Sequence, residues 1–329
     1  MTEQSKIDRN AARRAHKSAS LFERADAIFG LEGMGSEAVP SDLPRGKVPP
    51  SRSVPPRVET LAAASPQSAP AQPAAPHSVP DVEQAVALNG LRVTIDREDL
   101  RDAGLIVPEE PVTGLLEEFR IVKRELLADA RASGTPASRR ILVCSPHPGE
   151  GKTYCATNLA ISLAAERDLE VVLVDADVIN PSIARRLGLE PSKGLMDALA
   201  NPNLRPENLV SPTDIEGLFI MQAGTSSVLD AEYLTSARTG EVLDRLTRGA
   251  PNRIVIFDTP PALAASPAAE LAAHVGQALL VVRADETSRA ALEDARQLLS
   301  ACPDIKLLLN AAQFSPSGRR FGDYGDKGE

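Results

Sequence analysis

The chain has 329 residues, a formal net charge of -9, no tryptophan and only 3% aromatic residues. An acidic chain lacks the basic domain that nucleic-acid binders normally carry, so we expect no nucleic-acid partner. Its three cysteines form no C-x-x-C pair, its four histidines lack metal-ligand spacing, and no apolar run reaches the roughly 18 to 20 residues of a bilayer span. These features favour a soluble, cytoplasmic protein with no membrane span of its own.

Residues 1–90 differ in composition from the rest of the chain. Pro, Ala and Ser crowd residues 40–80 and leave little apolar material to bury, so we expect this arm to be disordered. Ahead of the Pro-rich part, a short amphipathic stretch has apolar residues at helical spacing: Leu21, Phe22, Ala25, Ile28 and Phe29. The stretch either forms a transient helix or docks on a partner or a membrane surface.

Residues 91–314 have the pattern of an α/β domain. Short aliphatic runs recur through them: "RRILVCS", "LEVVLVDAD", "GLFIMQAG", "NRIVIFDTPP", "QALLVVRAD" and "IKLLLNAAQ". Continuous Val/Ile/Leu runs predict strands covered on both faces, so we expect a doubly wound, mostly parallel sheet with crossover helices. Between two of these runs, Asn180 is expected to cap a helix that starts at Pro181. Residues 315–329 are expected to form a flexible tail.

The segment "CSPHPGEGKT" joins a predicted strand to a predicted helix, which is the context of a phosphate-binding loop. The glycines let the backbone approach a phosphate, Lys152 would neutralise phosphate charge, and the Thr153 hydroxyl would ligate Mg²⁺. Pro146 stands where the general motif has its first glycine, and a glycine turn before an ordinary helix is the alternative. The predicted nucleotide-binding segment is Gly149, Glu150, Gly151, Lys152, Thr153 and Tyr154.

Two further predicted strands end in carboxylates. "VVLVDAD" ends in Asp175 and Asp177, and "RIVIFDTPP" contains Asp258. The carboxyl ends of the strands form the binding crevice of a doubly wound sheet. A strand-ending aspartate is often only a turn former, but three of them behind a phosphate loop predict Mg²⁺ bound through Thr153 and one or two carboxylates.

The combination of "SPHPGEGKT", "VVLVDADVINPS" and "IVIFDTPP" resembles the three nucleotide motifs of bacterial tyrosine autokinases, P-loop kinases that control polysaccharide export. "EEFRIVKRELL" is similar to the E-x-x-R-x-x-R oligomerisation helix of that family, with Glu117, Arg120 and Lys123 at its three positions. The lead-in "LRVTIDREDLRDAGLIVPEE" and the closing "LLLNAAQFSPSGRRFG" more narrowly resemble the autokinases of exosortase-linked exopolysaccharide loci. The likeness covers about residues 91–324.

The resemblance implies a deviant P-loop NTPase fold with ATP and Mg²⁺ as cofactors. In that family pattern Lys152 and Thr153 bind the phosphates and Mg²⁺, and Asp175 and Asp258 support the metal. Asp177 helps to activate the acceptor hydroxyl. Asn310, at the end of the last predicted strand, would help to recognise adenine.

The resemblance also implies a homo-oligomer and a separate activator, a membrane-embedded chain-length regulator that would hold the kinase at the inner membrane. We expect Tyr324 to be the autophosphorylation site, modified between subunits. The tail glycines let its backbone extend into a neighbouring crevice. The other two tyrosines lie in predicted helical segments.

Two features depart from the family pattern. Ile179 occupies a position where the family usually has arginine, and Tyr324 is alone where the family has a tyrosine cluster. A catalytically weak ATP-binding adaptor that gates a membrane partner is therefore one alternative. The other is a positioning ATPase of the Min and Par type, whose loop needs lysine and glycine where this chain has His147 and Pro148.

Overall fold

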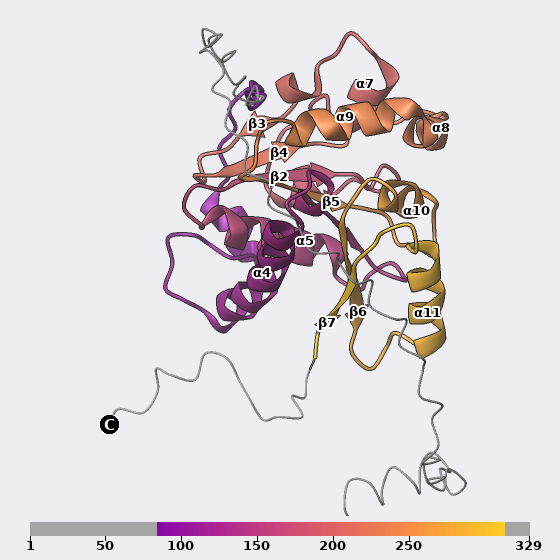
Figure 1. Cartoon of the computed structure of the whole chain (residues 1–329). Helices are drawn as coiled ribbons and strands as arrows, with labels where there is room; N and C mark the ends of the chain where they lie inside the picture. Colours follow the sequence, from indigo (N-terminus) through magenta and orange to yellow (C-terminus); the bar gives the residue numbers. More distant parts are fainter. Residues whose placement is uncertain (1–83, 313–329) are drawn as a thin grey trace, which may run out of the picture. The chain divides into compact units, whose positions relative to one another are not determined.

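The computed structural model describes residues 84–312 of the chain. The predictions for the amphipathic stretch, the Pro-rich arm and Tyr324 lie outside these residues. Within them, one seven-stranded sheet has the order β3-β4-β2-β5-β1-β6-β7, with β3 antiparallel to β4 and the other neighbours parallel (Figure 1). The strands are β1 (Arg140–Cys144), β2 (Glu170–Asp175), β3 (Ser211–Pro212), β4 (Leu218–Met221), β5 (Arg253–Asp258), β6 (Gln277–Arg283) and β7 (Ile305–Asn310).

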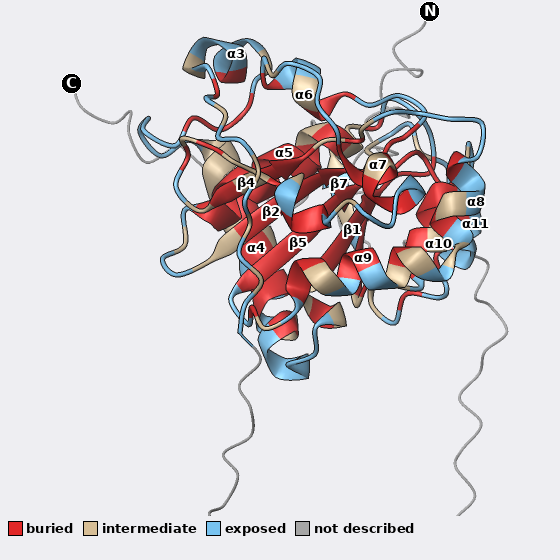
Figure 2. Ribbon diagram, turned by 90° about the horizontal axis from the view of Figure 1, so that it is seen from above, coloured by how far each residue is buried: buried red, intermediate tan, exposed pale blue. Residues whose placement is uncertain are grey.

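Helices cover both faces of this sheet, and Figure 2 shows the central strands buried between them. The helices are α3 (Arg97–Asp102), α4 (Gly114–Ser133), α5 (Lys152–Ala164), α6 (Ile183–Arg186), α7 (Leu195–Ala200), α8 (Asp230–Thr235), α9 (Ala237–Thr247), α10 (Pro267–Ala272) and α11 (Arg289–Leu298). Two short 3-10 helices are η1 (Ala137–Arg139) and η2 (Pro206–Asn208).

Side chains of each central strand alternate between two apolar cores, because successive residues of a strand point to opposite faces. In β1, Ile141 and Val143 pack with α4 and α5, whereas Leu142 and Cys144 pack with α7, α9, α10 and α11. Burial on both faces explains why the strand sequences are continuous apolar runs. The predicted α/β fold with a doubly wound, mostly parallel sheet is confirmed.

All six aliphatic runs form strands, namely β1, β2, β4, β5, β6 and β7. The seventh strand, β3, was not predicted because it has only two residues. The chain just before residue 94 lies beside it: the amides of Asn89, Gly90 and Val93 donate to the carbonyls of Glu207, Val210 and Pro212. The domain boundary at residue 91 stays a prediction.

The helix expected to begin at Pro181 begins two residues later, as α6, with Ser182 as its N-cap. The prediction that Asn180 caps it is wrong. The reason is a long-range contact, since the Asp175 carboxylate accepts hydrogen bonds from the amides of Ser182 and Ile183, both at 3.0 Å. A carboxylate from β2 therefore caps the helix in place of a local side chain.

Across residues 84–312, no helix combines the length and the apolar composition that a bilayer span requires.

Candidate functional site

The sheet brings the three predicted motifs together at the carboxyl ends of its central strands. β5 lies between β1 and β2, and Asp258 is the register partner of both Val143 and Asp175. The loop that follows β1 therefore starts beside the two strands that end in carboxylates. This is the edge at which doubly wound sheets bind ligands.

The loop from Ser145 to Gly151 turns sharply into α5. Gly149 and Gly151 have φ angles of 85° and 97°, which favour glycine. A Cβ on Gly151 would lie 2.1 Å from Nδ2 of Asn310, so the side chain of Asn310 also excludes any larger residue. The first amides of α5 have no intrahelical acceptors and, together with the helix dipole, form an anion-binding end.

Lys152, the first residue of α5, extends toward the ends of β2 and β5. Its Nζ lies 2.6 Å from Oδ2 of Asp177 and 4.0 Å from Oδ1 of Asp258. Both carboxylates are buried, and the lysine side chain is 13% exposed. The structure thus confines one cation between two carboxylates beside the loop, and phosphate oxygens would compete for it.

The carboxylate of Asp258 is suited to bind a metal ion. Its side chain is fully buried, and neither carboxylate oxygen has a hydrogen-bond partner among the described residues. Burial raises the pKa of Asp258 to about 7, against the nearby charge of Lys152. Two buried oxygens without donors fit Mg²⁺, which takes one or two carboxylates together with hydroxyl and water ligands. Among residues 84–312, no three His, Cys, Asp or Glu side chains are arranged to bind one metal ion. Mg²⁺ does not require three such ligands, because one or two carboxylates with waters usually hold it.

Asp175 is also buried, but its oxygens are already engaged. They accept from the amides of Asp177, Ser182 and Ile183 at 3.0–3.2 Å. Burial nevertheless raises the pKa of Asp175 to about 6. The Thr153 hydroxyl lies 3.4 Å from Nζ of Lys152. Of the three predicted metal ligands, Asp258 has its oxygens free, and Asp175 fixes the start of α6.

The side chain of Glu150 turns into the protein and contacts its own loop and the segment after β6. Its Oε2 accepts from the His147 amide at 2.7 Å, and its Oε1 accepts from the Thr287 hydroxyl. Its backbone carbonyl accepts from Nδ2 of Asn310 at 2.8 Å. Thr287 is a contact that the sequence did not single out. The sequence feature that could have indicated it is the position of Thr287 shortly after β6, a strand that pairs with β1.

Tyr154 lies in the first turn of α5. Its half-buried ring packs on the core that α4 covers, and burial raises the pKa of its hydroxyl. Ile179, where the family pattern has arginine, is 66% exposed. Its own side chain supplies no cation at this end of the sheet. The predicted roles of both positions stay predictions.

The predicted oligomerisation residues lie on α4, at two different depths. Glu117 and Arg120 form a half-exposed ion pair along the helix. Lys123 is buried instead, and its Nζ donates to the carbonyl of Ser162 at 2.7 Å and pairs with Glu166 at 2.7 Å. Lys123 therefore joins α4 to α5 within the subunit, whereas Glu117 and Arg120 stay accessible to a neighbour.

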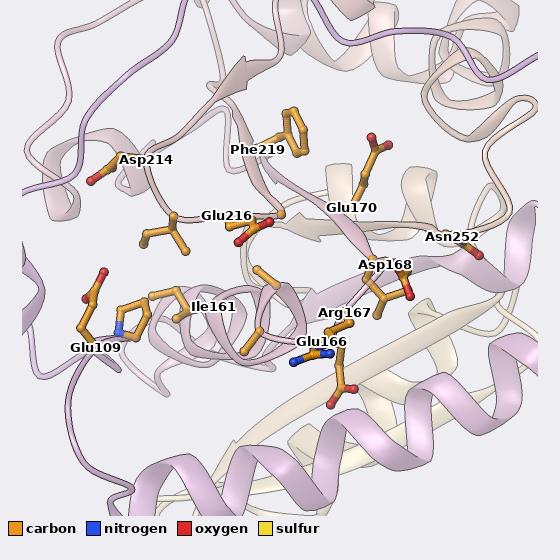
Figure 3. A pocket seen from close by; sticks show the side chains of 16 residues that line it. Glu109, Ile161, Glu166, Arg167, Asp168, Glu170, Asp214, Glu216, Phe219 and Asn252 are labelled. Atoms are coloured by element: carbon orange, nitrogen blue, oxygen red, sulfur yellow. The ribbon is translucent and has the colours of Figure 1, made fainter.

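A separate open cavity of about 1010 Å³ lies at the opposite end of the sheet, where β2, β4 and β5 begin (Figure 3). Its labelled wall residues include Glu109, Glu166, Asp168, Glu216 and Phe219. No residue of the phosphate loop lines it. The phosphate loop and this cavity therefore lie at opposite ends of the sheet.

Residues 137–306 match the family model described as ParA: NUBPL iron-transfer P-loop NTPase. The chain is 30% identical over 223 residues to the putative tyrosine-protein kinase EpsB of Ralstonia solanacearum, an alignment that covers 67% of this chain and 28% of EpsB. It is 28% identical over 225 residues to the tyrosine-protein kinase YwqD of Bacillus subtilis, covering 68% of this chain and 92% of YwqD.

Among solved structures, the kinase domain of the Escherichia coli tyrosine kinase ETK matches with a TM-score of 0.54 and 20% identity, over 70% of this chain and 92% of that domain. This likeness shows a common fold. The expected resemblance to bacterial tyrosine kinases is confirmed by these relatives, although the chain spans only 28% of the length of EpsB.

Proposed function

The chain belongs to the ParA family of P-loop NTPases, and we propose that it is an ATP-dependent protein-tyrosine autokinase that regulates exopolysaccharide biosynthesis and export. The observation that carries the proposal is the position of Lys152, at the start of α5, between the carboxylates of Asp177 and Asp258. Similarity to proteins named tyrosine-protein kinases supports a phosphotransferase rather than another use of this fold.

The proposed reaction transfers the γ-phosphoryl group of ATP to a tyrosine hydroxyl. The amides of the loop and Lys152 bind the phosphates. Before ATP binds, the Lys152 ammonium donates to the Asp177 carboxylate. Contact of Lys152 with a phosphate breaks this hydrogen bond and frees the carboxylate. Asp177 then accepts the tyrosine proton while the tyrosine oxygen bonds to the γ-phosphorus. The bond from that phosphorus to the β–γ bridging oxygen breaks, and ADP leaves.

Mg²⁺ would supply charge neutralisation at the phosphates when bound. The residues that fit it are Asp258, whose oxygens lack donors, and Thr153, whose hydroxyl lies beside Lys152. Asp175 supports the metal from the neighbouring strand. Its carboxylate is held by three backbone amides, which fixes its position.

The amide group of Asn310 supports adenine as the base. One proton of its Nδ2 donates to the carbonyl of Glu150, so Oδ1 and the second Nδ2 proton remain for a ligand. An acceptor at that position suits the exocyclic amino group of adenine.

Tyr324 is the acceptor in this proposal and lies outside the described residues. Transfer between subunits requires a homo-oligomer, for which the half-exposed Glu117–Arg120 pair offers a charged contact. The proposed partner is a membrane-embedded chain-length regulator that activates the kinase. It would hold this cytoplasmic chain at the periphery of the inner membrane.

A positioning ATPase of the Min and Par type is the second candidate, because the family model that matches is ParA. His147 and Pro148 stand where the loop of that type needs lysine and glycine. A weak ATP-binding adaptor is the third candidate, favoured by the uncharged Ile179. The three candidates differ in their products: phosphotyrosine, free phosphate, or neither.

The test mixes two variants with Mg-ATP and the cytoplasmic segment of the activator. One is an inactive Lys152→Met chain that keeps Tyr324, and the other is an active chain that carries Tyr324→Phe. Phosphotyrosine is then mapped by mass spectrometry. We expect phosphate on Tyr324 of the inactive chain. Free phosphate without phosphotyrosine would identify the positioning ATPase, and bound but unhydrolysed ATP would identify the adaptor.

A further inference from the structure

Glu150 places a negative charge inside a loop that must bind a polyanion. The side chain is only 5% exposed, so its carboxylate is held within the protein. Each of its two oxygens has one donor, the His147 amide for Oε2 and the Thr287 hydroxyl for Oε1. A carboxylate that lost the Thr287 donor would be held at Oε2 alone, and its Oε1 would have no donor.

Thr287 is itself fixed from two sides. Its hydroxyl accepts from the amide of Arg283, the last residue of β6, at 2.9 Å, and its own amide donates to the carbonyl of Arg283 at 3.0 Å. The next residue, Ser288, caps α11 by accepting from the amide of Ala291 at 3.1 Å. The hydroxyl therefore accepts from the Arg283 amide and directs its proton at the Glu150 carboxylate.

Asn310 joins the same arrangement from the next strand. Its carbonyl accepts from the amide of Ala284 at 2.9 Å, and its Nδ2 donates to the carbonyl of Glu150 at 2.8 Å. The segments that end β6 and β7 thus contact Glu150 at both its side chain and its backbone. These contacts span 137 and 160 residues of sequence.

We propose that Thr287 is a positioning residue for nucleotide binding: its hydroxyl holds the Glu150 carboxylate away from the phosphate-binding face of the loop. Glu150 in turn holds the His147 amide, so the first half of the loop is fixed before a ligand binds. The remaining loop amides stay available to phosphate. Affinity for Mg-ATP depends in this way on the segment after β6, which lies outside the phosphate-loop motif.

The inference rests on the proposed nucleotide binding, and the main test compares Thr287→Val with Thr287→Ser. Valine keeps the size of the side chain and removes both the donor to Glu150 and the acceptor of the Arg283 amide, whereas serine keeps the hydroxyl. Loss of one hydrogen bond to a charged group should weaken Mg-ATP binding about tenfold in Thr287→Val. Thr287→Ser should bind within about twofold of the unmodified chain, because serine keeps the hydroxyl that donates to Glu150.

Thr247→Val is the matched control. The Thr247 hydroxyl is buried and contacts a charged group too, since it accepts from Nη2 of Arg140 at 2.8 Å. Arg140 begins β1, at the far end of the strand from the loop. We expect Thr247→Val to lower the melting temperature and to leave the nucleotide Kd unchanged.

A double-mutant cycle separates positioning from general destabilisation. In a Glu150→Ala chain, Thr287 has no carboxylate to hold, so adding Thr287→Val should change the nucleotide Kd by less than about twofold. An undiminished tenfold loss in that background would overturn the proposal. Equal Kd values for Thr287→Val and the unmodified chain would overturn it as well.

Amide hydrogen exchange in the absence of nucleotide tests the contact independently of the proposed function. Thr287→Val should speed exchange of the His147 amide, whose acceptor loses its anchor, and Thr247→Val should not. If the unmodified chain binds no Mg-ATP, the proposed function fails while this exchange experiment still decides the positioning role. Unchanged exchange at His147 would contradict it.

Discussion

At the scale of single residues, Gly151 sets the geometry of the loop. Its φ of 97° disfavours a side chain, and Nδ2 of Asn310 would lie 2.1 Å from a Cβ at this residue. We expect Gly151→Ala to displace Asn310 or the loop and to weaken Mg-ATP binding at least about tenfold, since a contact to the loop carbonyl is lost. Isothermal titration with Mg-ATP measures this.

Gly134→Ala is its control. Gly134 ends α4 with a φ of 65°, and a Cβ there would meet no atom within 4 Å. Both substitutions should cost about 1–2 kcal/mol of stability from the left-handed backbone. Only the loop variant should lose affinity, and an equal loss in both would mean that backbone strain alone explains the result.

The sequence predicted where three site residues lie in the fold, and their roles stay predictions. Lys152 and Thr153 follow from the loop motif, and Asp258 follows from its place at the end of a strand. It did not predict that Asp175 caps α6 or that Glu150 contacts Thr287. These contacts depend on which strands become neighbours, and residue spacing within a single motif carries no information about that.

At the scale of elements, one ion pair joins η2 to α9. Glu207 is 4% exposed, and its carboxylate accepts from Nε and Nη2 of Arg245 at 2.6 and 2.7 Å. The hydrogen bonds from Arg245 lower the pKa of Glu207 below its ordinary value of 4.5. A lowered acid pKa stabilises the fold above that value, and this stabilisation is lost as the pH falls through the folded pKa.

We therefore expect Glu207→Gln to lower the free energy of unfolding by about 1–3 kcal/mol at pH 7. The difference from the unmodified chain should shrink as the pH falls below about 4. Urea unfolding at several pH values measures it. Glu241→Gln, which removes an exposed partner of Arg238 on the same helix, should have little effect. A Glu207→Gln deficit that persists undiminished at pH 3 would rule the ion pair out as its cause.

The strands could be predicted from the sequence where their apolar runs were long. Six aliphatic runs became six strands, because burial on both faces requires continuous apolar sequence. β3 has two residues, too few to form a pattern, and its pairing with β4 depends on the tertiary fold. The start of α6 was missed because the cap comes from β2 rather than from an adjacent residue.

At the scale of the whole molecule, assembly is predicted to depend on the outer face of α4. Glu117→Ala combined with Arg120→Ala should shift the sedimentation coefficient toward that of a monomer, because this pair is half exposed and able to contact a second copy. The matched control removes Glu293 and Arg296, a pair with the same spacing on α11. An unchanged oligomer in the α4 variant would contradict the prediction.

A Lys123 variant separates an effect on subunit stability from an effect on assembly. Because its ammonium is buried against α5 and Glu166, Lys123→Ala should destabilise the subunit itself. Thermal unfolding should therefore change in this variant, whereas the Glu117 and Arg120 substitutions should leave it nearly unaltered, as exposed pairs contribute only about 0–1 kcal/mol.

Tyrosine kinase activity is measured most directly by incubating the chain with Mg-ATP labelled at the γ-phosphate and separating phosphotyrosine from free phosphate. We expect label on tyrosine, a loss of about 100- to 1,000-fold in Lys152→Met, and unchanged labelling in Lys193→Met, which removes an exposed lysine. Label released only as free phosphate, or equal tyrosine labelling in Lys152→Met, would contradict this expectation.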